Sequence, residues 1–335
     1  MGMARFLIRR LIIIPPLLIV LSFFLFLCLH LAPGDPARLL AGPKADENQV
    51  ELVRKAYGLD KPIYVQYSRW LIGWPGPDPQ YIENIPEDLR EFYTSNIPKG
   101  ILRGDLGRSW KHESISQSIK ERLPVTLELT ILALLIAIGM GFFLGIVAAL
   151  KRGTIVDYLS TTGALFGLSM PSYWLGIMII LIVFYLFGVL PIYASNPTIS
   201  ILLAATALGA FHTASVARMT RSSMLEVMGE DYIRTARVKG LSERVVVLKH
   251  GLKNALIPII TILVLQIPWL FGGAVVLERV FGIPGMGRLM LDSIFPHSDP
   301  FVVLDLFLVF MVLTVLANLL ADILYAYVNP KIRYE

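Results

Sequence analysis

The chain has 335 residues, of which 55% are hydrophobic and only 16% are charged, and its mean hydropathy is +0.65. A soluble globular domain carries about 25% charged residues, so this composition excludes an ordinary soluble protein and indicates membrane spans. The formal charge of +5 does not indicate nucleic-acid binding, because the basic residues gather beside apolar runs. The single cysteine, Cys28, lies within an apolar run and cannot form an intrachain disulfide.

Six apolar runs predict six transmembrane helices, and hence an all-α polytopic membrane protein. Each run has at least 19 residues, and at a rise of about 1.5 Å per residue this length crosses a hydrocarbon core of about 30 Å. The first run is too long for a signal peptide, so we expect it to be retained. Pro171 predicts a kink in the third run. The runs cover residues 6–31, 125–150, 155–186, 199–217, 256–277 and 302–328.

The positions of the basic residues predict the orientation in the membrane. Residues 1–10 hold three arginines and no acidic residue, and residues 218–253 hold eight basic and four acidic residues. Basic residues also follow the second and the last run, at 151–152 and 331–333. These four segments alternate correctly for one side, which predicts that both termini are cytoplasmic.

The opposite side would carry a small extracytoplasmic segment, residues 33–124, between a first helix at 1–32 and a five-helix core at 125–335. An amphipathic helix is predicted at residues 47–57, and the prolines of residues 74–100 disfavour long helices or central strands. Contact with an external partner, gating of an outer entrance and a plain surface lid are the alternative roles of this segment.

The most charged stretch, residues 218–258, predicts a short helix held between two bends. Gly229 permits the first bend, and Gly240 ends the helix. Asp231 suits the positive N-terminal end of the helix and is a candidate N-cap. Tyr232, Ile233 and Ala236 would form a small apolar face. This helix could dock onto a soluble partner or lie on lipid headgroups.

The same stretch resembles the EAA loop of ABC-importer permeases, a motif written E-A-A-x-x-x-G. The matching positions are Arg234, Thr235, Ala236 and Gly240, with Arg and Thr in place of the first Glu and Ala. These departures are similar to those of the dipeptide/oligopeptide/nickel permease subfamily, and the chain most resembles its dipeptide permease B type. Further matching motifs are PGDP at 33–36, GLDKP at 58–62, GDLG at 104–107, TLEL at 126–129, KRG at 151–153, PGMGR at 284–288 and VNPKIR at 328–333.

The resemblance implies a type I ABC-importer permease fold and a role as one half of the translocation pathway for di- or oligopeptides. Implied partners are a second homologous permease in a heterodimer, two ABC ATPase subunits, an extracytoplasmic solute-binding protein and the lipid bilayer, with no nucleic acid. ATP and Mg would be bound by the partner subunits and no cofactor by this chain, which lacks a phosphate-binding G-x-x-x-x-G-K-[ST] loop. The residues implied in ATPase coupling are Glu230, Asp231, Tyr232, Arg234, Thr235, Ala236, Arg237, Lys239, Gly240 and Leu241.

Polar and small residues within the runs suggest further contacts. Glu128, Asp305 and Asp322 are ionisable residues near span ends, where hydration or pairing is the simpler expectation. Gly141 with Gly145, and Gly272 with Gly273, predict close helix approach. Candidate residues for a translocation path are Gln266, Trp269, Ser169 and Pro171.

Two other classes of function fit the sequence less well. A polytopic membrane enzyme is disfavoured because the five histidines show no metal spacing and neither H-E-x-x-H nor G-x-S-x-G occurs. An ion-coupled carrier would leave the loop helix unexplained. Within the ABC importers, nickel or oligosaccharides remain alternative solutes.

Overall fold

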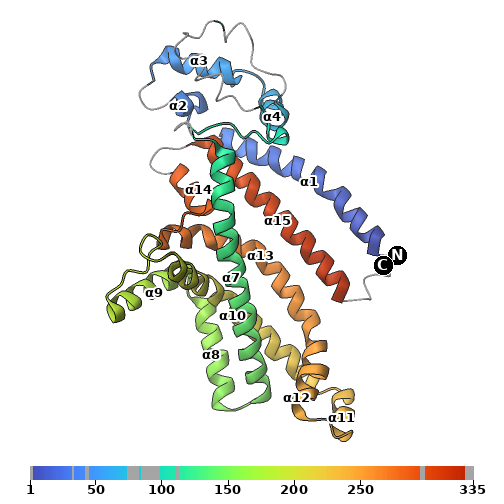
Figure 1. Ribbon diagram of the computed structural model, residues 1–335. Helices are drawn as coiled ribbons and strands as arrows, with labels where there is room; N and C mark the ends of the chain where they lie inside the picture. Colours follow the sequence, from blue (N-terminus) through green and yellow to red (C-terminus); the bar gives the residue numbers. More distant parts are fainter. Residues whose placement is uncertain are drawn as a thin grey trace. The chain divides into compact units, whose positions relative to one another are not determined.

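The computed structural model describes residues 3–31, 34–41, 45–73, 83, 99–109, 113–294 and 299–328, and Figure 1 shows its helices. Within these residues the chain is helical, with two isolated β-bridges and no strand, which confirms the all-α class. The chain divides into two compact units. The first comprises Met1–Ile12, Val125–Arg288 and Leu313–Glu335, and the second comprises Ile13–Pro124 and Leu289–Val312.

Five helices of the described part are long and apolar enough to cross a membrane. They correspond to the first, second, fourth, fifth and sixth predicted runs. The helix of the second run begins ten residues before that run, and the helix of the fourth run continues eleven residues past it, to Met228. These helices are α1 (Met3–Leu31), α7 (Ile115–Leu150), α10 (Pro197–Met228), α13 (Lys253–Phe281) and α15 (Pro300–Val328).

The third predicted run does not form one kinked span. It forms two shorter helices, α8 (Ile155–Ser169) and α9 (Ser172–Phe187). Met170 between them is extended, with φ −93° and ψ 125°. The ring of Pro171 disfavours the α conformation of the preceding residue, so the helix ends before the proline instead of bending through it.

The core of the first unit lies where α7, α10 and α13 pack together. Leu129, Leu208 and Leu277 are at most 2% exposed and belong to one cluster. The predicted close approach at Gly141 and Gly145 is confirmed. A β-carbon added at Gly145 would lie 2.5 Å from Cβ of Thr220 on α10, so the two helices need glycine there.

The close approach predicted at Gly272 and Gly273 is confirmed for Gly273 only. A β-carbon added at Gly273 would lie 2.6 Å from Leu208 Cδ1, whereas Gly272 has nothing within 4 Å. Gly273 therefore lets α13 approach α10, and Gly272 faces open space.

The second unit contains α2 (Pro36–Ala41), α3 (Glu47–Tyr57), α4 (Ile63–Ile72) and the 3₁₀ turn η1 (Ile101–Arg103). The bounds of α3 are those predicted. Asp46 and Gln49 form a capping box at its start, and Gly58, with φ +68°, caps its end. Arg54 of α3 donates to both carboxylate oxygens of Asp35, at 3.3 and 2.6 Å, which ties the PGDP motif to this helix. Residues 74–98, apart from Glu83, lie outside the described residues.

The ionisable residues of the spans have structural partners in two of three cases. The Trp70 indole N–H donates to Asp305 Oδ1 at 3.1 Å, and Arg10 lies 2.9 Å from Asp322. Glu128 is exposed. The expectation that these groups are paired or hydrated is therefore confirmed for Asp305 and Asp322.

Candidate functional site

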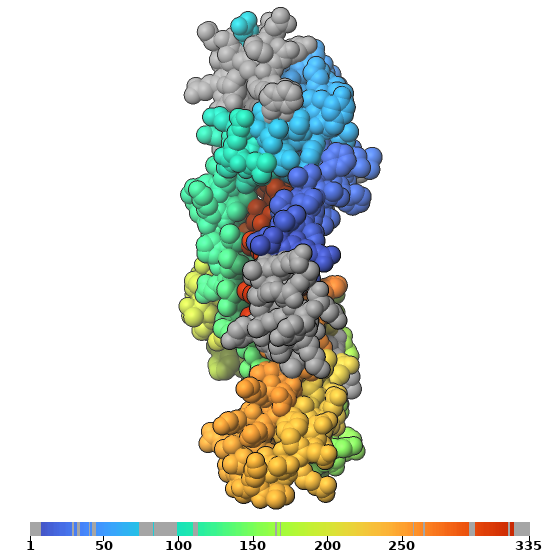
Figure 2. All heavy atoms as spheres, turned by 90° about the vertical axis from the view of Figure 1, so that its right-hand side faces the viewer, coloured from blue at the N-terminus to red at the C-terminus, as the bar shows by residue number. Residues whose placement is uncertain are grey.

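The loop between α10 and α13 forms a compact lobe at one end of the first unit (Figure 1). It contains α11 (Asp231–Val238), α12 (Glu243–Val245) and the π-helix η2 (Val246–Leu252), which continues into α13 without interruption. In Figure 2 the yellow and orange atoms of this part of the sequence form a continuous protruding surface.

The two predicted bends are present, but they differ in backbone conformation. Gly240 has φ +74°, a left-handed conformation that favours glycine, whereas Gly229 has φ −84°, which other residues adopt freely. The prediction that Asp231 caps the helix is wrong. Glu230 is the N-cap residue, without a side-chain cap bond, and Asp231 begins the helix and places its charge near the positive end of the dipole.

One face of α11 packs against its own chain. Ile233 is fully buried and Ala236 is 5% exposed, and both cluster with Val246 of η2. Tyr232 lies at the edge, 41% exposed, and its hydroxyl accepts a hydrogen bond of 2.9 Å from the Asn254 amide. Of the two small residues of the motif, Ala236 thus faces inward and Thr235 outward.

The other face of α11 is open. Val238 is 83% exposed and Leu241 is 40% exposed, so apolar side chains are presented between the polar ones. The Thr235 hydroxyl donates to the Asp231 carbonyl at 3.0 Å. The remaining exposed residues of this face are Glu230, Asp231, Arg234, Arg237, Lys239 and Gly240.

Arg237 has a partner inside the loop. Its guanidinium donates to both carboxylate oxygens of Glu243, at 3.2 and 2.8 Å. This hydrogen bond, with the attraction of the positive charge, lowers the pKa of Glu243 below its ordinary value. The pair spans the bend at Gly240 and links α11 to α12, the helix that follows.

A second ion pair, absent from the sequence-based prediction, braces the base of the loop. Arg221 of α10 donates to both oxygens of Asp157 of α8, at 2.6 and 2.8 Å. The Gly153 N–H also donates to Asp157, at 3.0 Å, which explains part of the KRG motif. Arg221 lies within the charged stretch 218–258, but no spacing rule connects it to a residue 64 positions earlier.

The candidate path residues Ser169, Pro171 and Trp269 line one hollow of about 350 Å³ in the first unit. Ser172, Phe211 and His212 also line it. Trp269 lies in the middle of α13, and its side chain is 75% exposed. The structure thus brings together residues from the α8–α9 break, α10 and α13.

Gln266, the fourth candidate, does not line the hollow directly. Its amide oxygen lies 3.1 Å from Nδ1 of His212, and both side chains are buried. His212 was not among the predicted path residues, because a lone histidine in an apolar run carries no spacing signal. Gln266 therefore contacts a residue that lines the hollow, His212, without lining the hollow itself.

Long apolar helices around a small-residue core, with a short two-faced helix on one connecting loop, are the arrangement expected for the permease of an ABC importer. The chain belongs to the family of binding-protein-dependent transport system inner membrane components, whose pattern matches residues 141–334. The N-terminal family that accompanies it matches residues 3–76. The chain is therefore a membrane-embedded permease component of an ABC importer, and this membership implies ATPase and substrate-binding partners.

Relatives cover the full chain. The glutathione transport system permease protein GsiC of Escherichia coli O6:H1 is 40% identical over 334 residues, which is 99% of this chain and 100% of the relative. GsiC of Shigella boydii serotype 4 and of Escherichia coli K12 match with the same identity and coverage.

Solved structures show the fold. Inward-facing MetNI, a methionine ABC transporter, has a chain that matches with a TM-score of 0.53 and 18% identity, covering 63% of this chain and 96% of that one. A chain of an amino acid ABC transporter matches with a TM-score of 0.51 and 16% identity, covering 63% and 94%. The ABC-importer permease fold is thus confirmed.

Proposed function

We propose that α11 is the coupling helix of this permease and that its open face seats in a groove of a separate ATPase subunit. The division of the helix into two faces supports this role. Ile233 and Ala236 anchor α11 to the chain, which leaves Arg234, Thr235 and the exposed apolar Val238 available to a partner. A helix lying on lipid would instead direct its apolar face toward the membrane.

Polar contacts to the ATPase would come from Glu230, Asp231, Arg234 and Lys239. Tyr232, Arg237, Gly240 and Leu241 would hold or border the docking surface, with Arg237 acting through Glu243. ATP and Mg are assigned to the partner subunits, where hydrolysis takes place. This chain works as a transport subunit and binds no cofactor of its own.

Movement of α11 would reach the solute path through α13. The helical path from Glu243 to Phe281 is continuous and carries Gln266 and Trp269. The pair of Arg237 and Glu243 fixes α11 to the start of this path. Docking and closure of the ATPases would then tilt α13 and change the hollow, in an alternating-access cycle.

The solute that fits best is a di- or oligopeptide or a related thiol peptide. The support is the full-length similarity to permeases named for glutathione transport, together with hydroxyl, imidazole and indole groups around the hollow. These groups can form hydrogen bonds with the amides of a peptide. Selection of the particular peptide would be made by an extracytoplasmic solute-binding protein. The partner across the path would be a second homologous permease, and both termini would be cytoplasmic.

Cysteine crosslinking tests the docking. In a Cys28→Ser background, Val238→Cys should crosslink to the ATPase in the assembled transporter, while Ile155→Cys, which is 76% exposed on α8, should not. A Val238→Cys variant that labels with membrane-embedded reagents and never captures the ATPase would show that α11 lies on lipid instead.

Transport measurements test coupling and solute together. Arg234→Glu should lower uptake of labelled glutathione or dipeptide into proteoliposomes by more than about tenfold, because a charge reversal at an interface costs several kcal/mol. The matched reversal Arg152→Glu, on the turn between α7 and α8, should stay within about twofold. Unchanged uptake with Arg234→Glu would refute the coupling role, and ATPase activity stimulated only by nickel or oligosaccharide-loaded binding protein would refute the peptide solute.

A further inference from the structure

A pocket of about 140 Å³ lies between α7, α8 and α10, apart from the hollow and from α11. Leu144 and Ala148 belong to the last two turns of α7, and Ser160 belongs to the second turn of α8. The α7–α8 connection at 151–154 therefore lies close to it along the chain, on the same side as the loop that follows α10. The pocket therefore lies near the end of α7, a helix long and apolar enough to cross a membrane, and the end of such a helix is expected at the level of the lipid headgroups.

The walls of this pocket are divided by polarity. Arg218, Arg221, Ser160 and Thr161 supply guanidinium and hydroxyl groups. Leu144, Gly145, Ala148, Ala164 and Ala217 supply an apolar wall of mostly small residues. A cavity with a cationic rim and a narrow apolar wall matches a phosphate group that carries an acyl chain.

The charges of the rim leave an excess of positive charge. Asp157 is the acidic group that faces it, and it binds Nε and Nη2 of Arg221. Arg218, one turn earlier on the same face of α10, is exposed and has no ion-pair partner among the described residues. A guanidinium has five N–H donors, so both arginines retain donors for a further anion, and arginine suits the oxygens of a phosphate.

We propose that this pocket binds a phosphate group, and that its natural ligand is the headgroup of an anionic phospholipid of the adjoining leaflet. Arg218 is the principal phosphate ligand and Arg221, oriented by Asp157, is the second. The small side chains along α7 and α8 leave the groove in which the first part of an acyl chain lies. A lipid held there would rest against both α8 and α10 and join the two helices that the ion pair already braces.

Binding to the delipidated full-length chain in detergent tests this proposal, with short-chain dioctanoyl-phosphatidylglycerol as probe. Arg218→Gln should raise the dissociation constant of the probe about tenfold, since a charged hydrogen bond is lost. Lys151→Gln removes an equal charge on the exposed turn outside the pocket and should change it by less than about twofold. Dioctanoylglycerol, which lacks the phosphate, should bind without any dependence on Arg218.

Two further measurements distinguish a lipid headgroup from free inorganic phosphate as the ligand. Ala164→Phe should fill the space beside the apolar wall and so weaken binding of the lipid probe. Inorganic phosphate should compete only weakly with the probe. If inorganic phosphate displaces the probe fully and Ala164→Phe has no effect, the pocket binds a free phosphate rather than a lipid. Equal weakening by Lys151→Gln and Arg218→Gln would show diffuse surface attraction and overturn the site. None of these measurements depends on transport, so they fail or succeed separately from the coupling role.

Discussion

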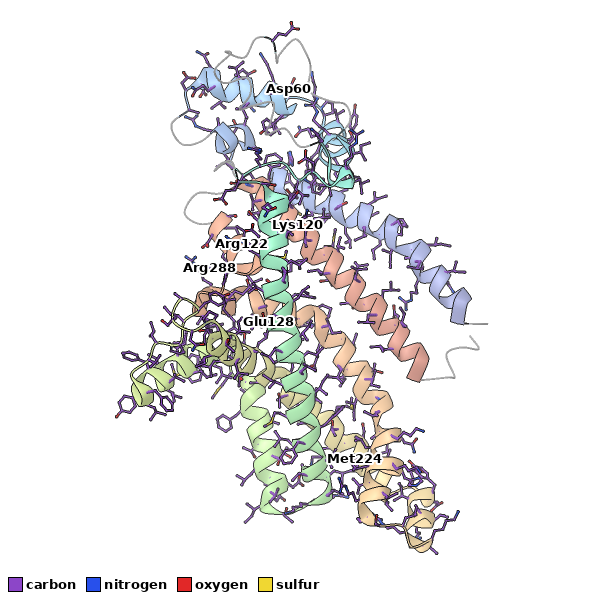
Figure 3. All side chains as sticks on the ribbon, viewed as in Figure 1. Asp60, Lys120, Arg122, Glu128, Met224 and Arg288 are labelled. Atoms are coloured by element: carbon purple, nitrogen blue, oxygen red, sulfur yellow. The ribbon has the colours of Figure 1, made fainter. Side chains whose placement is uncertain are left out.

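The Thr126 hydroxyl donates to Oε1 of Glu278 at 2.7 Å, although 152 residues separate the two in the chain. Thr126 also accepts from the backbone N–H of Met286 at 2.8 Å, and the Arg288 N–H donates to the other oxygen of Glu278 at 2.9 Å. Glu278 is fully buried. One carboxylate of α13 and one hydroxyl of α7 therefore hold the PGMGR motif, where α14 (Met286–Ile294) begins (Figure 3 labels Arg288).

Thr126→Val should destabilise the protein by about 2 kcal/mol, because it removes two buried hydrogen bonds, the one donated to the Glu278 carboxylate and the one accepted from the Met286 N–H. Thr130→Val is the matched control. Its hydroxyl, equally buried, donates only to the Thr126 carbonyl at 2.6 Å, and its loss should cost less than about 1 kcal/mol. Melting temperatures of the two variants in detergent measure the difference, and equal losses would contradict the linking role of Thr126.

Gly285→Ala should also be destabilising, by about 1–3 kcal/mol. A β-carbon at this position would lie 2.2 Å from the Glu278 carboxyl, which is held by its own hydrogen bonds and cannot move aside cheaply. Gly272→Ala, at a helical position with nothing within 4 Å, should be neutral or slightly stabilising. If Gly285→Ala has the melting temperature of the parent protein, a β-carbon at position 285 fits beside the Glu278 carboxyl and the prediction is wrong.

The two glycines that bracket α11 should respond differently to substitution. Gly240→Ala forces a β-carbon into a left-handed conformation, at a cost of about 1 kcal/mol, and should shift the helix angle and lower transport-coupled ATP hydrolysis. Gly229→Ala should be tolerated, because its φ is −84° and its added carbon would lie 3.3 Å from the Glu226 carbonyl oxygen and 3.8 Å from that of Leu225. Equal ATP hydrolysis by both variants in proteoliposomes would show that the bend at Gly240 has no role in coupling.

The ion pair between Arg237 and Glu243 predicts a pH dependence of the loop. The pKa of Glu243 is lowered in the folded state, so its contribution to stability is fully present above the ordinary glutamate pKa and is lost as pH falls through the lowered value. Amide hydrogen exchange of residues 231–245, corrected for intrinsic rates, should show α11 less protected in Glu243→Gln than in the parent at pH 7. The two proteins should converge in acid, and a difference that persists there would point to another cause.

Trp269 should matter for transport and not for folding. Its side chain is 75% exposed at the hollow, so Trp269→Ala should lower peptide uptake while the melting temperature stays within about 2 °C. Leu265→Ala, one turn earlier on α13 and 62% exposed, also truncates an exposed apolar side chain, but Leu265 is not among the residues that line the hollow, so uptake should stay intact. Equal loss of uptake in both variants would argue against a solute contact at Trp269.

Local sequence determined much of this protein. Apolar runs of span length set five long helices, and the capping residues of α3 set its bounds, because these features depend on neighbours within a few residues. The short helix of the loop was also readable from Gly229, Gly240 and the residues between them. Pro171 marked a disruption, but the extended conformation that it imposes on Met170 was missed.

Only the tertiary structure decided which distant residues meet. The partnerships of Asp157 with Arg221 and of Thr126 with Glu278 join different helices, and the contact of Gln266 with His212 orients a side chain of the hollow. No periodicity encodes such pairs, because a helix repeat reports which face is apolar and not which helix lies against it. For the same reason the sequence placed Ala236 on α11 without revealing that it turns inward toward Val246.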